Sequence, residues 1–208
     1  MHVVILSWEY PPRIVGRLAE HVSELATQLV KHKVATYVVT YHDFLTGSSE
    51  EDSGVKTFRV TNPVRTHIGV LTWVLTLNQE VERTAATIYY QIDKKIDLID
   101  ACDWHFIPAA VTLKKALGIP FVYSVESIEE HRFPGMDSPF NMAIKSIEWM
   151  GFYEAGKICA TSEWIRDEIV RIYKVPLEKI KVVASNTNRW VQDVLDLYNT
   201  VAGGANCE

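Results

Sequence analysis

The chain has few cysteines, no long apolar run and no block of like charge. Its three cysteines, Cys102, Cys159 and Cys207, are widely spaced and form no C-x-x-C pair, so neither a disulfide framework nor a structural zinc site is predicted. Lys and Arg number 21 against 26 Asp and Glu, which gives a net charge of −5. This balance disfavours nucleic acid and a membrane surface as partners and favours a partner in solution.

Targeting and membrane-spanning segments are also missing from the pattern. The first ten residues, "MHVVILSWEY", carry neither a basic n-region nor a small-residue cleavage site, and later apolar runs are short and interrupted. Secretion and membrane insertion are therefore disfavoured, and a cytoplasmic location is expected.

What the sequence does contain is a regular alternation of strand-type and helix-type segments. The strand-type segments are "VVILSWEY", "VATYVVTYH", "KTFRVT", "IDLIDA", "FVYSVE", "KICATS" and "KIKVVA". Helical periodicity covers residues 18–32, 71–94, 107–117, 142–152 and 164–173. This alternation predicts one doubly wound, Rossmann-like α/β domain with a parallel sheet of six or seven strands, covered on both faces. The polar stretch "DFLTGSSEEDSGV" is expected to be a surface loop.

The ends of these strands are where ligands are expected, because doubly wound sheets bind ligands beyond the carboxyl ends of their strands. After the first strand, "EYPPRIVGRLAEHV" places two prolines and Gly16 before a helix. The prolines predict an extended loop, Gly16 a tight turn, and the helix N-terminus a set of free N–H groups for an anion. A single glycine in this place is more often a structural turn than a phosphate loop.

The stretch "DACDWHF" after the fourth predicted strand combines a thiol, carboxylates and an imidazole. If a helix begins just after Cys102, its dipole and His105 would lower the thiol pKa and make Cys102 a nucleophile. Glu126, after the next strand, could then orient an imidazole or act as a base. The alternative, equally supported, is that Cys102 fills the core and His105 packs at a strand end. A metal site is a weaker option, so we expect no metal and no cofactor.

Four motifs in order carry a resemblance to a known family: "WEYPPRIVGRLAEHV", "DWH", "SIEEHR" and "TSEWIRDEIVRIYKVPLEKIKVV". They resemble the N-terminal half of glycosyltransferases that have two Rossmann domains (the GT-B type). The nearest groups are glycosyltransferase family 4 and the glycogen and starch synthases. The resemblance spans roughly residues 1 to 183. It implies ligand contacts in the cleft from Gly16, Arg17, Asp103, Glu129 and Arg132.

Several positions depart from the family pattern. The usual Gly-Gly-Leu of the first loop is "GRL", so Arg17 stands where the second glycine would be and is expected to fill space that a sugar nucleotide occupies. Asp100 and Cys102 replace the two histidines of "HxHDW". Glu126 replaces the histidine of "HS-x-E-x-G-R", and His131 replaces its glycine. Positions 17, 100, 102 and 126 are expected on one rim of the ligand cleft at the strand ends. Their clustering suggests that selection or engineering changed the entrance of this cleft.

Beyond Val183 the family continues as "PNG" into a second Rossmann domain, whereas this sequence reads "ASNTN" and then "RWVQDVLDLYNTV". That segment has a broad apolar helical face and resembles the final helix of such enzymes, which crosses back onto the N-terminal domain. We therefore expect a domain over 1–184 and a linker with a docked helix over 185–208.

Three functions follow as hypotheses. The first is an acceptor-side glycosyltransferase domain that lacks the donor-nucleotide domain and transfers no sugar. The second is a thiol-dependent hydrolase or esterase built on Cys102. The third is a non-catalytic binding scaffold. In each, a small molecule or sugar is expected in the cleft at the strand ends.

Overall fold

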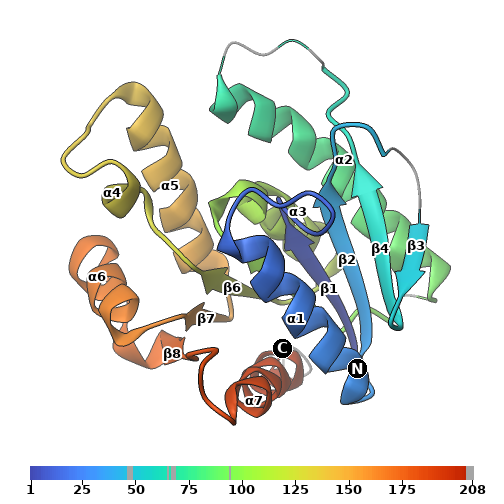
Figure 1. The fold of residues 1–208 in the computed structure, drawn as a ribbon. Coiled ribbons are helices and arrows are strands. Elements are labelled where there is room, and N and C mark those ends of the chain that lie inside the picture. Colours follow the sequence, from blue (N-terminus) through green and yellow to red (C-terminus); the bar gives the residue numbers. More distant parts are fainter. Residues whose placement is uncertain (46–48, 65, 67–68, 94, 205–208) are drawn as a thin grey trace.

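The computed structural model describes residues 1–45, 49–64, 66, 69–93 and 95–204. One sheet with the order β3-β4-β2-β1-β5-β6-β7-β8 runs through them (Figure 1). The winding reverses between β1 and β5, which is the topological switch point of a doubly wound sheet. The predicted α/β fold is thereby confirmed. Its parallel strands are β1 (His2–Ser7), β2 (Ala35–Tyr41), β4 (Val55–Val60), β5 (Leu98–Cys102), β6 (Phe121–Val125), β7 (Lys157–Ala160) and β8 (Ile180–Val182).

The predicted strand count was wrong by one, because β3 (Ser49–Asp52) lies in the segment that was expected to be a loop. It pairs antiparallel with β4 at the edge of the sheet, with Asp52 opposite Val55. Ser53 and Gly54 connect them with positive φ angles of 53° and 81°, the geometry of a tight two-residue hairpin. The acidic sequence "SEED" has low strand propensity, so the only signal in the sequence was the Ser-Gly turn.

Helices cover both faces of the sheet (Figure 1). One face carries α1 (Arg17–Lys31) and α7 (Trp190–Gly204), and the other carries α2 (Val70–Gln91), α3 (Ile107–Leu117), α5 (Pro139–Glu154) and α6 (Glu163–Tyr173). Shorter helical turns are η1 (Trp104–Phe106), α4 (Glu129–Arg132) and η2 (Leu177–Lys179). Local signals set the ends: the Ser138 hydroxyl accepts from the Asn141 N–H at 3.2 Å to begin α5, and Gly118 ends α3 with a φ of 71°.

The C-terminal segment docks as a helix on the sheet, as its apolar face predicted. Tyr198 is 1% exposed, and its hydroxyl donates a hydrogen bond to the buried carboxylate of Asp100 on β5. Helix α7 runs to Gly204, three residues beyond the predicted end, whereas Cys207 and the other residues of 205–208 lie outside the described part of the chain. Its buried side chains are Trp190, Val194, Leu195, Leu197, Tyr198 and Val201.

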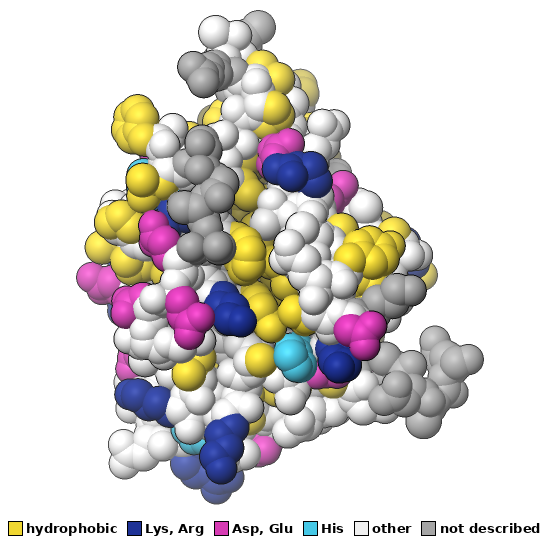
Figure 2. Space-filling view, turned by 90° about the vertical axis from the view of Figure 1, so that its right-hand side faces the viewer, with side chains coloured by type: hydrophobic (Ala, Val, Ile, Leu, Met, Phe, Trp, Pro, Cys, Tyr) yellow, Lys and Arg dark blue, Asp and Glu magenta, His cyan; other side chains and the backbone are white. Residues whose placement is uncertain are grey.

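The surface of the described residues carries both signs of charge. Figure 2 shows acidic and basic side chains interspersed with hydrophobic ones on the face that includes the β3 edge. No helix among the described residues is long and apolar enough to cross a membrane.

Candidate functional site

An open cleft of about 830 Å³ lies at the carboxyl edge of the sheet, where ligands were expected. The first turns of α1 supply Arg17 and His21, and Glu126 follows the end of β6. Ser162 precedes α6, and Trp164 lies in its first turn. The cleft therefore brings together segments that are far apart in the sequence. Its remaining lining residues are Glu20, Glu24, Thr161, Glu163, Ile165, Val182, Ala184, Ser185 and Asn186.

Two predicted site residues, Arg17 and Glu126, do face this cleft. Burial raises the pKa of Glu126, and the positive charge of Arg17 partly offsets that rise. The His21 ring nitrogen lies 3.8 Å from the Glu126 carboxylate. Burial also lowers the pKa of His21, against the pull of Asp100. Both shifts favour the neutral forms, which weakens any charge–charge attraction between His21 and Glu126.

The loop before α1 differs from the expected anion site. Gly16 has an extended backbone (φ −146°), and an added Cβ would meet the Glu9 carboxylate at 3.5 Å, an ordinary contact. The predicted tight turn at Gly16 was therefore wrong. The N–H groups of Val15 and Gly16 both donate to Glu9 Oε2, each at 2.7 Å. Glu9 is 5% exposed, and its carboxylate occupies the N–H groups of the two residues directly before α1. Sequence reasoning missed this residue.

Cys102 does not have the environment that was predicted for a nucleophile. It is 2% exposed and packs in the core beneath α1 and α7. Burial, with the negative charges of Asp100 and Asp103 adding to it, raises the pKa of the Cys102 thiol well above its usual value. The predicted lowering of this pKa was therefore wrong. Asp100 is also buried under α7, so positions 100 and 102 lie beneath the rim, whereas 17 and 126 lie on it. The role of Cys102 as a nucleophile stays a prediction that its burial disfavours.

His105 faces a different layer from Cys102. Its ring stacks against Trp8 and Trp104, with centroids 4.8 and 4.4 Å apart, and Trp104 packs on α2 and α5. Burial, and then the positive charges of Arg132 and Arg13, lower the pKa of His105 to about 3. The imidazole is therefore neutral, and its aromatic contacts fit the packing alternative better than the role of a base for Cys102.

Asp103, whose predicted ligand contact stays a prediction, fixes the loop that carries Glu126. Its Oδ1 accepts from the N–H of Glu126 at 2.9 Å and of Ser127 at 3.4 Å. Asp103 has a φ of 57° and is 7% exposed. Burial raises the pKa of Asp103 to about 6, although Arg132 opposes the rise. The carboxylate thus positions the cleft wall from below.

Glu129 and Arg132, also predicted to bind ligand, belong to a buried ion-pair network. The Arg132 guanidinium donates to Glu129 at 3.0 Å and to Glu148 at 2.7 Å. Glu148 is fully buried and accepts further hydrogen bonds from the Glu129 N–H at 2.8 Å and from the Tyr173 hydroxyl. Burial raises the pKa of Glu148 to about 7. The network ties α4, α5 and α6 together, and the ligand role of Glu129 and Arg132 stays a prediction.

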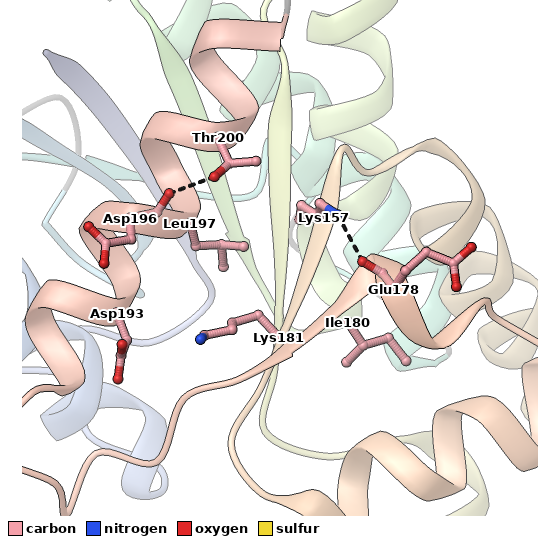
Figure 3. A pocket seen from close by; sticks show the side chains of 8 residues that line it. All are labelled: Lys157, Glu178, Ile180, Lys181, Asp193, Asp196, Leu197 and Thr200. Atoms are coloured by element: carbon pink, nitrogen blue, oxygen red, sulfur yellow. Dashed lines mark hydrogen bonds between the residues drawn. The ribbon is translucent and has the colours of Figure 1, made fainter.

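A smaller cavity of about 260 Å³ lies between α7 and β8 (Figure 3). The Lys181 amine points into it toward Asp193, and Lys157, at the start of β7, donates to the Glu178 carbonyl at 2.8 Å. Because Lys157 begins β7 whereas the larger cleft follows the end of β7, the two hollows lie toward opposite ends of that strand. None of the predicted site residues lines the smaller one.

Comparisons with known proteins place the chain in a family. The family model for Glycosyltransferase Family 4 matches residues 18–185, and the chain therefore belongs to glycosyltransferase family 4. An uncharacterized glycosyltransferase of Methanocaldococcus jannaschii is 34% identical over 198 residues, which are 93% of this chain and 48% of the relative. Glycogen synthase of Mycobacterium tuberculosis is 23% identical over 91% of this chain and 50% of the relative. The chain spans about half the length of these curated relatives.

The solved structures agree on the fold. Sucrose-phosphate synthase from Thermosynechococcus elongatus has, in one structure, a TM-score of 0.70 at 12% identity. The match covers 98% of both chains. A second structure of the same enzyme matches with a TM-score of 0.69 at 16% identity, over 90% of this chain and 48% of that one. The predicted resemblance to the N-terminal domain of GT-B glycosyltransferases is confirmed.

Proposed function

We propose that this domain forms the acceptor side of a glycosyl transfer site, binds a hexose-containing ligand in the carboxyl-edge cleft, and transfers no sugar by itself. The observation that carries this is the 830 Å³ cleft, which α1, β6 and the turn after β7 line together at the place where doubly wound sheets bind ligands. Relatives named as glycogen synthase and sucrose-phosphate synthase support a sugar as ligand. A cytoplasmic location stays a prediction.

The absence of transfer is supported by the loop before α1. A nucleotide diphosphate bound there would compete with the Glu9 carboxylate for the N–H groups of Val15 and Gly16. The side chain of Arg17 also lines the same side of the cleft. The relatives are about twice as long as this chain, which leaves room in them for a second half that binds the donor.

The docked helix supports the same proposal. One structure of sucrose-phosphate synthase matches over 98% of both chains. Because the match covers 98% of this chain, the unmatched residues are too few to make up α7, so α7 is part of the match. We infer that α7 has a counterpart in that structure and belongs to the acceptor-side domain.

Binding and transfer are tested separately. Saturation-transfer NMR with maltotriose should show binding with a Kd of about 1 mM, a weak affinity typical of an open polar cleft. Glu126→Ala should weaken binding about 3-fold, because it removes an acceptor for a sugar hydroxyl. Glu51→Ala, at the exposed β3 edge, is the matched control. UDP-glucose or ADP-glucose with a glucan should give no product. Failure of maltotriose to bind would contradict the sugar site, and measurable turnover would contradict the proposal that this domain transfers no sugar by itself.

A further inference from the structure

Trp164 is a large apolar side chain left in the open at the cleft. It is the second residue of α6, which begins where the Ser162 hydroxyl accepts from the Ile165 N–H at 3.2 Å. Trp164 lines the cleft and is 60% exposed. Because Trp164 is exposed beside a cavity, its flat apolar face is open to a ligand that enters the cleft.

The orientation of this indole is fixed from behind. The His131 ring stacks on Trp164 with a centroid distance of 4.0 Å and an interplanar angle of 23°. The His131 Nε2 is held by Glu168 at 3.1 Å, and Arg171 holds Glu168 at 2.7 Å. His131 stands where the family pattern has glycine, which could not stack. The support therefore belongs to this chain, and it leaves the remaining indole surface as a rigid platform.

The polar groups around the platform suit hydroxyl groups better than phosphates. Carboxylates outnumber the single arginine, Arg17, among the lining residues, so a phosphorylated ligand would meet repulsion. Carboxylates, hydroxyls and an amide are acceptors and donors for the equatorial hydroxyls of a sugar. Such groups in the lining include the carboxylates of Glu20, Glu24 and Glu126 and the amide of Asn186.

We propose that Trp164 is the stacking platform for a neutral, gluco-configured pyranose ring. The ring has axial C–H groups that pack on the indole and equatorial hydroxyls that reach the surrounding carboxylates and the Asn186 amide. The inference rests on the proposed function, because it names the ligand class and the anchoring residue of the same cleft. Trp164 acts here by contact with the ligand and takes no part in bond making.

The test compares Trp164→Ala with Trp149→Ala by maltotriose titration. Trp149 is the matched control because it is 54% exposed, stacks on Tyr153 on α5, and does not line the cleft. Trp164→Ala should weaken maltotriose binding about 10-fold, whereas Trp149→Ala should stay within about 2-fold of the parent chain. Trp164→Phe, which keeps an aromatic face, should retain most of the affinity.

A second readout reports stacking directly. Axial protons of one glucose ring should shift upfield on binding to the parent chain, through the ring current of the indole, and this shift should vanish in Trp164→Ala. If maltotriose binds the parent chain and Trp164→Ala equally well, with unchanged proton shifts, the platform is wrong and the sugar cleft stands. If maltotriose does not bind the parent chain, the proposed function fails and the platform fails with it.

Discussion

Replacing Arg132 by methionine is expected to lower the free energy of unfolding by ~3–5 kcal/mol, the usual cost of leaving buried partner charges uncompensated. Arg132 donates to Glu129 and Glu148, which are 1% and 0% exposed. Methionine fills part of the volume but leaves both carboxylates without the guanidinium. Urea unfolding at pH 7.5, followed by circular dichroism, measures the loss.

The control for this substitution is Arg83→Met. The Arg83 side chain is 68% exposed and pairs with Glu80 one turn earlier on α2, so its loss should cost less than about 1 kcal/mol. Equal losses for the two arginines would show that the buried network contributes no more than a surface pair.

The cost of Arg132→Met should shrink at low pH. Burial raises the folded-state pKa of Glu148 to about 7 and of Asp103 to about 6. A carboxyl with a raised folded pKa contributes stability that falls as pH rises from its unfolded value through its folded value. Without the guanidinium, the folded-state pKa values of Glu148 and Asp103 should rise further. At pH 5 these carboxyls are protonated and uncharged, so losing Arg132 costs less free energy there than at pH 7.5. A cost that is the same at both pH values would contradict the raised pKa of Glu148.

Deleting residues 186–208 is expected to abolish cooperative folding. The deletion removes six buried side chains of α7 and exposes the apolar face of the sheet that they cover. At ~1.5–3 kcal/mol for each large apolar side chain, the loss is on the order of 10 kcal/mol, which is comparable with the whole stability of a domain. Thermal melts followed by near-ultraviolet circular dichroism would show no sharp transition in the shortened chain.

Single substitutions in α7 separate packing from the presence of the helix. Leu197→Ala, at a buried position, should cost ~2–5 kcal/mol, whereas Asn199→Ala, at an exposed one, should stay within about 0.5 kcal/mol. Unchanged melting of the shortened chain, or equal effects of the two substitutions, would contradict the docking of α7.

The fold could be predicted because its signals are local. Alternating runs such as "FVYSVE" and "KICATS" became β6 and β7 within a residue or two of their expected bounds. The β3 strand was not predicted because its acidic residues have low strand propensity. They form a strand by pairing with β4, and residue propensities carry no information about that pairing.

The site was harder to predict because burial depends on distant segments. Asp100 and Cys102 lie at the end of a strand, where the sequence predicted the rim of a ligand site. In the structure, α7 covers both residues, although it lies about 100 residues later in the chain. Glu148 lies in the largely apolar helical segment "SIEWMGFYEAG" and was not predicted as part of a network. An acidic residue among core residues could have indicated a buried, oppositely charged partner. Glu9 lay next to the predicted anion loop, and a carboxylate there could have suggested that the loop is already occupied.

Backbone amide mapping by NMR during a maltotriose titration tests the sugar cleft most directly. The proposed function predicts that the largest shifts fall on segments 16–24, 126–127, 161–165 and 184–186, which line or border the 830 Å³ cleft. Shifts confined to the smaller cavity between α7 and β8, or no shifts at maltotriose concentrations well above about 1 mM, would contradict it.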